Sequence, residues 1–163
     1  VEVLVDKSMS LSRFLELYRT CPPDVRVSFV HLVRDGRGNA HSMSRRTGDS
    51  VEKAAREWKW TNLVIELVKS VLPRVSIQTL HYEELCRSPE IVCERALRSV
   101  EASAHGHPSL DTEVDHGIGG NSGSFQGYES IRLDERWTRQ LSNSDLEEFN
   151  AAAGWLNRQY GYR

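Results

Sequence analysis

The sequence predicts an α/β fold built on a parallel sheet. Residues 25–33 are largely apolar, with Val and Phe dominating, which is typical of a strand buried on both faces. A short apolar stretch at residues 1–6 and a helical pattern at residues 11–18 precede it, so strand, helix and strand follow one another. This order predicts a βαβ unit with a right-handed crossover, which brings the carboxyl ends of both strands to one rim of the sheet.

Helical spacing, caps and prolines delimit the predicted helices. Apolar residues predict a helix over residues 11–18 that Ser10 or Ser12 caps and a proline pair ends. Another helix is predicted from Gly38, and a longer one over residues 51–72 ends before a proline.

The second half of the chain continues the alternation of strands and helices. Residues 75–80 have the alternating pattern of a strand near an edge, and Ser88 with the following proline opens the next helix. Residues 134–137 begin another helix, and Asn143 or Ser144 is expected to cap the last one.

Length and composition predict one globular domain over residues 1–163. Hydrophobic residues make up 39% of the chain and charged residues 27%, which is ordinary for a protein with a sizeable core. The net charge of −2, with mixed signs along the chain, argues against a nucleic-acid binder. The sequence contains no run of eighteen apolar residues, so no membrane segment is predicted within the chain. The chain begins with VEVLV and no initiator Met, so we expect a fragment with an upstream part.

Cysteine and tryptophan residues are expected in the core. Cys21, Cys86 and Cys93 are odd in number and lack C-x-x-C spacing, which disfavours a zinc knuckle and a disulfide framework. They are predicted to be buried free thiols. Trp58 and Trp60 share a helix with an aliphatic stripe, which favours core packing over a stacking platform.

A long polar loop is predicted between residues 102 and 127, where Gly, Ser, His and Asp dominate. Its metal-ligating residue types are His105, His107, Asp111, Asp115 and His116. They form no helical i, i+4 pair and no compact ligand motif, so no metal site is predicted. Residues 117–123, GIGGNSG, resemble a phosphate cradle only in composition.

Two predicted strand ends carry candidate functional residues. Arg34 follows the apolar strand directly, and a helix beginning near Gly36 would turn its backbone N–H groups toward the same place. This predicts an anion site, with the alternative that Arg34 and Asp35 form an ordinary polar strand end. Asp6 and Lys7 would face the same crevice, either as a solvated turn or as a general base beside an anion-binding cation.

Two further residues extend this candidate site. Ser42 lies eight residues after Arg34, two turns into the predicted helix, and its hydroxyl either points back toward the loop or belongs to an ordinary surface serine. Tyr82 follows the second strand and either packs in the core or forms the wall of a site for a ring-shaped ligand.

These residues resemble the sulfotransferases that use 3′-phosphoadenosine 5′-phosphosulfate (PAPS). Residues 32–42, LVRDGRGNAHS, look like the family's strand, turn and helix, in which an Arg and a Ser eight residues later hold the 3′-phosphate. These positions are Arg34 and Ser42. Residues 5–8, VDKS, are similar to a strand end that reads Glu-Lys-Ser or Glu-Lys-Thr in heparan-type members, with Asp6 at the position of the catalytic Glu.

Later segments extend the resemblance in the same order along the chain. Residues 82–89, YEELCRSP, are similar to a Tyr-Glu-Asp-Leu…Pro segment whose Tyr lies near the adenine. Residues 116–121, HGIGGN, match a His-x-Ile-x-Gly-Asn loop of the carbohydrate-type branch and bring Asn121 into the donor site. The segments DERW at 134–137 and YGY at 160–162 match that branch's tail.

The resemblance implies a three-layer, P-loop-like α/β fold and transfer of a sulfuryl group from PAPS to a hydroxyl or amine, with a carbohydrate favoured as acceptor. Asp6 is then the catalytic base and Lys7 stabilises the sulfate. Arg34 and Ser42 bind the 3′-phosphate, Tyr82 lies against the adenine, and no metal is required. The implied compartment is the Golgi lumen for a eukaryotic carbohydrate-type member and the cytoplasm for a bacterial one.

Two departures from the family pattern keep another function open. The Gly-rich loop that binds the 5′-phosphosulfate would lie upstream of Val1, and Ser124 stands where the family has an Arg of the 3′-phosphate clamp. Loss of one charge-assisted contact costs about 1.5–3 kcal/mol, or roughly ten- to hundredfold in affinity. Arg132 is the candidate replacement.

The alternative function is that of a non-catalytic, truncated or degenerate module that binds a nucleotide or a partner. A nucleotide kinase is disfavoured because no Gly-x-x-x-x-Gly-Lys-Ser/Thr motif is present.

Overall fold

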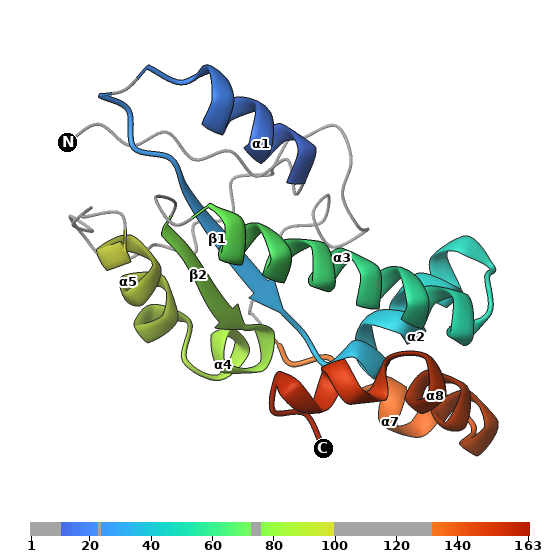
Figure 1. Cartoon of the computed structure of the whole chain (residues 1–163). Coiled ribbons are helices and arrows are strands. Elements are labelled where there is room, and N and C mark those ends of the chain that lie inside the picture. Colours follow the sequence, from blue (N-terminus) through green and yellow to red (C-terminus); the bar gives the residue numbers. More distant parts are fainter. Residues whose placement is uncertain (1–10, 23, 73–75, 100–131) are drawn as a thin grey trace.

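The computed structural model describes residues 11–22, 24–72, 76–99 and 132–163 (Figure 1). This part of the chain combines helices with a parallel pair of strands, which confirms a mixed α/β architecture. The elements in chain order are α1 (Leu11–Thr20), β1 (Ser28–Val33), α2 (Gly36–Thr47), α3 (Val51–Val71), β2 (Ser76–His81), α4 (Tyr82–Arg87), α5 (Pro89–Ser99), α7 (Trp137–Gln140) and α8 (Asn143–Gln159).

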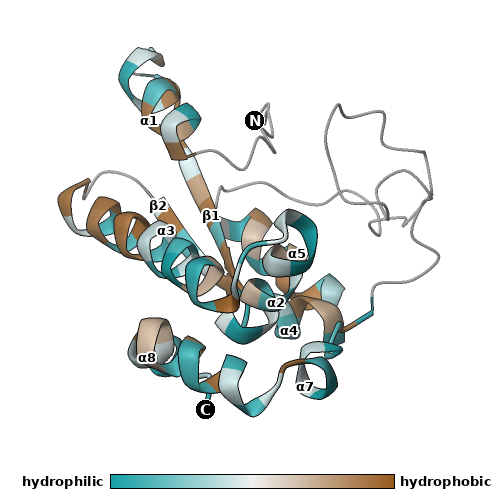
Figure 2. Cartoon of the chain, turned by 90° about the vertical axis from the view of Figure 1, so that its right-hand side faces the viewer, coloured by the Kyte–Doolittle hydropathy of each residue, from teal (hydrophilic) through white to brown (hydrophobic). Residues whose placement is uncertain are grey.

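The two strands pair in parallel, with Ser28 opposite Ser76 and Val33 opposite His81. The chain crosses from β1 to β2 through α2 and α3, the kind of helical connection that a parallel pair requires. Figures 1 and 2 show α3 on one side of the sheet and α5 on the other. Both strands end at the same edge, so Arg34 and Tyr82, which follow them, are brought together.

The hydrophobic core lies where the end of β1 meets α2, α3 and α8. Its central side chains are fully shielded from solvent, with Phe149 and Ala40 at 0% exposure and Val33 at 1%. The buried members of this cluster are Val33, Ala40, Val51, Ala54, Ala55, Trp58, Phe149, Ala153 and Leu156. The core therefore fixes the carboxyl end of β1, directly before Arg34.

The first residue of α2 fits into this core because it has no side chain. A Cβ atom at Gly36 would lie 2.7 Å from Cζ of Phe149 and 3.0 Å from Cε3 of Trp58. The Gly36 N–H donates a hydrogen bond to the buried Asn157 Oδ1 at 2.8 Å, so α8 supplies the acceptor. These contacts set the position of the strand-to-helix turn.

The expectation that the first long strand is buried on both faces is wrong. β1 begins at Ser28, and Val30 and Leu32 are 43% and 46% exposed. On their side of the sheet, α5 covers mainly β2, where Leu80 is 4% exposed and Val92 of α5 is fully buried. The apolar sequence pattern specified a strand, and the packing of α5 against β2 decided which of its residues are shielded.

The expected core tryptophans and cysteines need a correction. Trp58 is in the core, but Trp60 is 62% exposed because it lies two residues further around α3. Cys21, Cys86 and Cys93 are free thiols as predicted, yet they are partly exposed and not buried. They lie after α1, on α4 and on α5, and each of these elements has a side open to solvent.

Most helix boundaries agree with the sequence patterns, but α4 was not predicted, α7 begins only at Trp137, and the caps of two helices differ. Ser142 caps the last helix in place of Asn143 or Ser144, because its hydroxyl accepts the Asp145 N–H at 3.1 Å and the Asp145 carboxylate accepts the Ser142 N–H at 2.9 Å. Ser12 lies inside α1 and therefore does not cap it.

Among the described helices, none has the length and apolar character to cross a membrane.

Several predictions from the sequence lie outside the described residues. These are the strand over residues 1–6 with Asp6 and Lys7, the cap Ser10, and the polar loop over residues 102–127 with its histidines and aspartates, Asn121 and Ser124.

The variant Gly36→Ala tests the packing of the strand-to-helix turn. We expect it to lose about 1–3 kcal/mol of unfolding free energy, because the added methyl group would overlap Phe149. Urea unfolding measures this loss. The control Arg46→Ala changes an exposed residue of the same helix and should stay within about 0.5 kcal/mol of the parent. Equal stability of Gly36→Ala and the parent would contradict the tight approach.

Candidate functional site

Arg34 lies at the carboxyl end of β1 and is oriented by two neighbours. Its Nη2 donates to the backbone carbonyl of Asp134 at 2.7 Å and lies 3.3 Å from Oδ2 of the same residue. Its guanidinium carbon lies 4.8 Å from the centre of the Tyr82 ring, within the range of a cation–π contact. Within the described part of the chain, Nε and Nη1 have no acceptor. Nε faces Gly38 of α2, where a Cβ atom would lie 3.1 Å from it, so Nη1 is left as a donor for a ligand.

Tyr82 connects Arg34 to the segment before α7. It is the first residue of α4, a short helix that the sequence did not predict. Its hydroxyl donates to the Arg132 carbonyl at 3.3 Å and lies 3.4 Å from the backbone nitrogen of Asp134, which donates to it. Burial, above all other causes, raises the pKa of Tyr82, so the phenol is neutral near pH 7.

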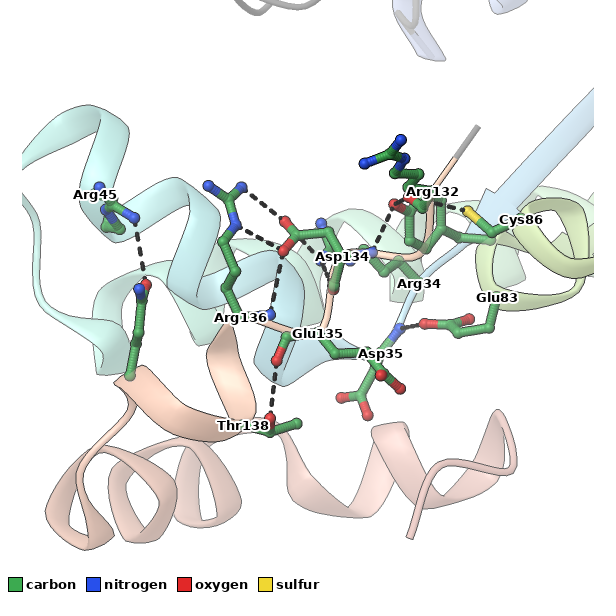
Figure 3. A network of polar contacts seen from close by, with 12 residues as sticks. Arg34, Asp35, Arg45, Glu83, Cys86, Arg132, Asp134, Glu135, Arg136 and Thr138 are labelled. Carbon is green, nitrogen blue, oxygen red and sulfur yellow. Dashed lines mark hydrogen bonds and ion pairs between the residues drawn. The ribbon is translucent and has the colours of Figure 1, made fainter. Parts of the chain in front are cut away.

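Asp134 lies between two arginines (Figure 3). Arg136 binds its carboxylate in a bidentate manner, with Nε 2.8 Å from Oδ1 and Nη2 3.0 Å from Oδ2. The Arg136 backbone N–H also donates to Oδ1 at 3.2 Å. These hydrogen bonds from Arg136, together with the charge of Arg34, hold the pKa of Asp134 well below its ordinary value. The carboxylate is therefore ionised and fills a position that suits an anion.

Three N–H groups at the start of α2, where the sequence predicted an anion site, are already bound to protein acceptors. The Gly36 N–H is bound by Asn157, and the Arg37 N–H donates to the Asp35 side chain at 2.9 Å. The Asp35 N–H donates to Glu83 Oε1 at 3.0 Å. Because these three backbone donors already have protein acceptors, the guanidinium group of Arg34 is the main candidate for binding an anion at this edge.

Arg37 is a structural residue in this corner. Its Nη2 lies 2.6 Å from Asp35 Oδ2 and its Nε lies 3.0 Å from Oδ1, so the two charges compensate each other. The guanidinium carbon lies 4.5 Å from the centre of the Trp137 ring. Arg37 thus holds α7 against the start of α2.

Tyr162 links the C-terminal segment to the ends of both strands. Its hydroxyl donates to Glu83 Oε2 and lies 3.1 Å from Nδ1 of His81 and 3.3 Å from the Val33 carbonyl. Burial and the neighbouring Glu83 carboxylate raise the pKa of Tyr162, so its hydroxyl keeps its proton. The turn that carries Arg34 is therefore held by α4 and by the end of the chain together.

Ser42 lies on the side of α2 that faces Arg34. A Cβ atom at Gly38 would lie 3.1 Å from Nε of Arg34, so this helix face is directed toward the guanidinium group. Ser42 follows Gly38 by four residues and so lies one turn along the same face. Its side chain is exposed, and the described residues include no hydrogen-bond partner for its hydroxyl.

The structure brings together two of the residues that the sequence singled out, because Arg34 contacts Tyr82 directly. Ser42 lies one turn further along α2 from Gly38, which faces Arg34. Asp6, Lys7 and Asn121 are outside the described residues. No group of His, Cys, Asp and Glu in the described part of the chain could hold a metal ion.

Sequence reasoning missed the carboxylate between the arginines. Asp134 and Arg136 belong to the DERW segment, whose sequence indicates only a helix start and a family-like tail. The spacing of an acidic residue two positions before an Arg is a weak signal. The role of Asp134 becomes evident only when the fold places it beside Arg34, which is 100 residues away in sequence.

No family model, curated protein or solved structure matches this chain, so its function is inferred from the residues and their geometry.

A second polar cluster lies on the α3 side of the sheet and has a structural role. His31 Nε2 lies 2.9 Å from Asn62 Oδ1, and Asn62 Nδ2 donates to the Trp58 carbonyl at 2.7 Å. Since the amide oxygen is an acceptor, Nε2 carries the proton of a neutral ring. Burial is the main cause that lowers the pKa of His31, and the nearby charge of Lys69 adds to it.

The low pKa of His31 predicts a loss of stability in acid. The unfolded chain binds a proton at this residue below about pH 6.5 while the folded chain resists it, so stability falls as pH decreases from that value. This residue contributes at most about 1.4 kcal/mol for each pH unit. Urea unfolding of His31→Gln, which keeps a donor for Asn62, should show a flatter decrease between about pH 7.5 and 5.5 than the parent. Parallel curves would contradict the neutral, buried state.

Proposed function

We propose that this chain belongs to a PAPS-dependent sulfotransferase and binds the 3′-phosphoadenosine end of the donor at the carboxyl edge of β1 and β2. One observation supports this above all: Arg34 contacts the Tyr82 ring, while the Ser42 hydroxyl, which has no hydrogen-bond partner among the described residues, lies on the facing side of α2. A cation, a hydroxyl donor and an aromatic surface are the groups that a phosphorylated nucleoside requires.

The position of this corner agrees with the way parallel α/β sheets bind ligands. Such ligands collect outside the carboxyl ends of the strands, where Arg34 and Tyr82 lie. Helices on both sides of the β1–β2 pair are in keeping with a three-layer, P-loop-like arrangement, which is part of the proposal.

The charges around Arg34 favour a phosphate over a neutral group. Arg34 has an Nη1 donor without an acceptor within the described part of the chain, and Arg136 shares the Asp134 carboxylate with it (Figure 3). Charge-assisted hydrogen bonds from guanidinium groups to phosphate are among the strongest in proteins. Arg132, in the segment that leads to Asp134, is the proposed replacement for the arginine absent at Ser124.

The proposed reaction is an in-line transfer. The acceptor oxygen or nitrogen forms a bond to sulfur, the bond from sulfur to the phosphate oxygen of the donor breaks, and the acceptor proton passes to Asp6 as base. Lys7 would stabilise the charge on the sulfuryl group, and Asn121 would join the donor site. A carbohydrate hydroxyl is the proposed acceptor. The non-catalytic alternative uses the same nucleotide site without the transfer step.

Calorimetric titration with adenosine 3′,5′-bisphosphate tests the nucleotide site. The parent should bind, and Arg34→Ala should bind roughly ten- to hundredfold more weakly because a charge-assisted contact is lost. Arg98→Ala is the matched control, since Arg98 is 75% exposed on α5 and pairs only with Glu94 among the described residues. Equal affinity of Arg34→Ala and the parent would show that Arg34 does not bind the phosphate.

Ser42→Ala separates the hydroxyl from the guanidinium contribution. We expect a roughly two- to tenfold loss of affinity for the same nucleotide, which is the effect of one neutral hydrogen bond. Unfolding in urea should be unchanged, because the side chain is exposed and has no partner in the described residues. An unchanged affinity would remove Ser42 from the site and leave Arg34 to be judged by its own variant.

A further inference from the structure

We infer that Asp134 is an internal anion that occupies part of the phosphate site of Arg34 in the ligand-free protein, so a phosphate that binds Nη2 of Arg34 as well as its unpaired donors has to displace the Asp134 carboxylate. This inference rests on the proposed nucleotide site and deepens it. It makes Asp134 a residue that sets both the affinity of the site and the kind of anion that the site accepts.

The contacts of the carboxylate are those expected of a bound anion. Two guanidinium groups converge on Oδ2, with Nη2 of Arg136 at 3.0 Å and Nη2 of Arg34 at 3.3 Å. Oδ1 accepts a hydrogen bond from Nε of Arg136 at 2.8 Å. Phosphate oxygens are bound by arginines with the same planar, paired geometry.

The two contacts of Arg34 with Asp134 differ in length, and this difference allows exchange. The bond to the backbone carbonyl is 2.7 Å, whereas the contact with the carboxylate is 3.3 Å, longer than a usual charge-assisted hydrogen bond. Arg34 would therefore stay anchored to the Asp134 backbone when the carboxylate turns away. The cation–π contact with Tyr82 holds its guanidinium group from another side.

The surroundings of Asp134 leave room for this movement. The residue lies in irregular chain before α7, and its side chain is 23% exposed. Arg136 is the next cation along the chain, and its side chain is 66% exposed, so it can follow the carboxylate toward solvent. The displaced carboxylate thus keeps one partner.

Displacement selects for a phosphate monoester. A terminal phosphate carries close to two negative charges near pH 7 and three acceptor oxygens, while the carboxylate that it replaces carries one charge and two oxygens. A phosphodiester or a carboxylate ligand brings one charge and gains little from the exchange. The site should therefore favour adenosine 3′,5′-bisphosphate over adenosine 3′,5′-cyclic monophosphate.

The variant Asp134→Asn removes the competing charge and keeps the shape of the side chain. By calorimetry it should bind adenosine 3′,5′-bisphosphate roughly three- to tenfold more tightly than the parent, and its preference over the cyclic monophosphate should shrink. Glu135→Gln is the matched control, because it makes the same charge change at the next residue, which is exposed and has no side-chain contact with Arg34. The control should keep the affinity and the preference of the parent.

The outcomes separate this inference from the proposed function. If the parent binds and Asp134→Asn binds equally or more weakly, the displacement is wrong and the nucleotide site stands. If neither the parent nor the two variants bind while all three unfold cooperatively, both are wrong.

A measurement on the parent protein avoids dependence on the variant's folding. The Nε–H signal of Arg136 in a ¹H–¹⁵N spectrum, assigned with Arg136→Lys, reports on its bond to Asp134. It should shift when the bisphosphate is added, because the shared carboxylate changes position. If the protein is saturated with nucleotide and the Arg136 Nε–H signal does not shift, the inferred displacement of Asp134 is wrong.

Discussion

The close approach of α2 to the core is the constraint on which the rest of the site depends. Gly36 lies against Phe149 and Trp58, and its N–H is bound by Asn157 of α8. A larger residue would push the turn away from the core and move Arg34, two positions earlier, with it. Apolar packing therefore positions a charged residue, and the polar contacts of that residue with Tyr82 and Asp134 complete its orientation.

At this edge of the sheet, some charged groups are bound within the protein and others are free to bind a ligand. Arg37 is neutralised by Asp35, and the N–H groups of Asp35, Gly36 and Arg37 have protein acceptors, so these donors do not serve a ligand. Arg34 retains donors without acceptors in the described residues, and it shares the Asp134 carboxylate with Arg136. A site that already contains an internal anion is suited to a ligand of higher charge, which is the physical link between the geometry and a nucleotide phosphate.

Local sequence patterns predicted the helices and strands well, because apolar spacing, caps and prolines act over a few residues. The pairing of Arg34 with Tyr82 was also foreseeable, since both follow strands of one parallel sheet. The exposure of Leu32 and Trp60 was not, because it depends on which helix packs against which strand. Asp134 was missed for the same reason, as nothing within its own segment indicates an arginine 100 residues earlier.

A crystal structure of the chain with adenosine 3′,5′-bisphosphate is the sharpest test of the nucleotide site. The 3′-phosphate should lie within hydrogen-bond distance of Arg34 and Ser42, the adenine near Tyr82, and the Asp134 carboxylate should be turned away from Arg34. A nucleotide bound elsewhere, or one bound with the Arg34–Asp134 contact intact and no phosphate at Arg34, would contradict it.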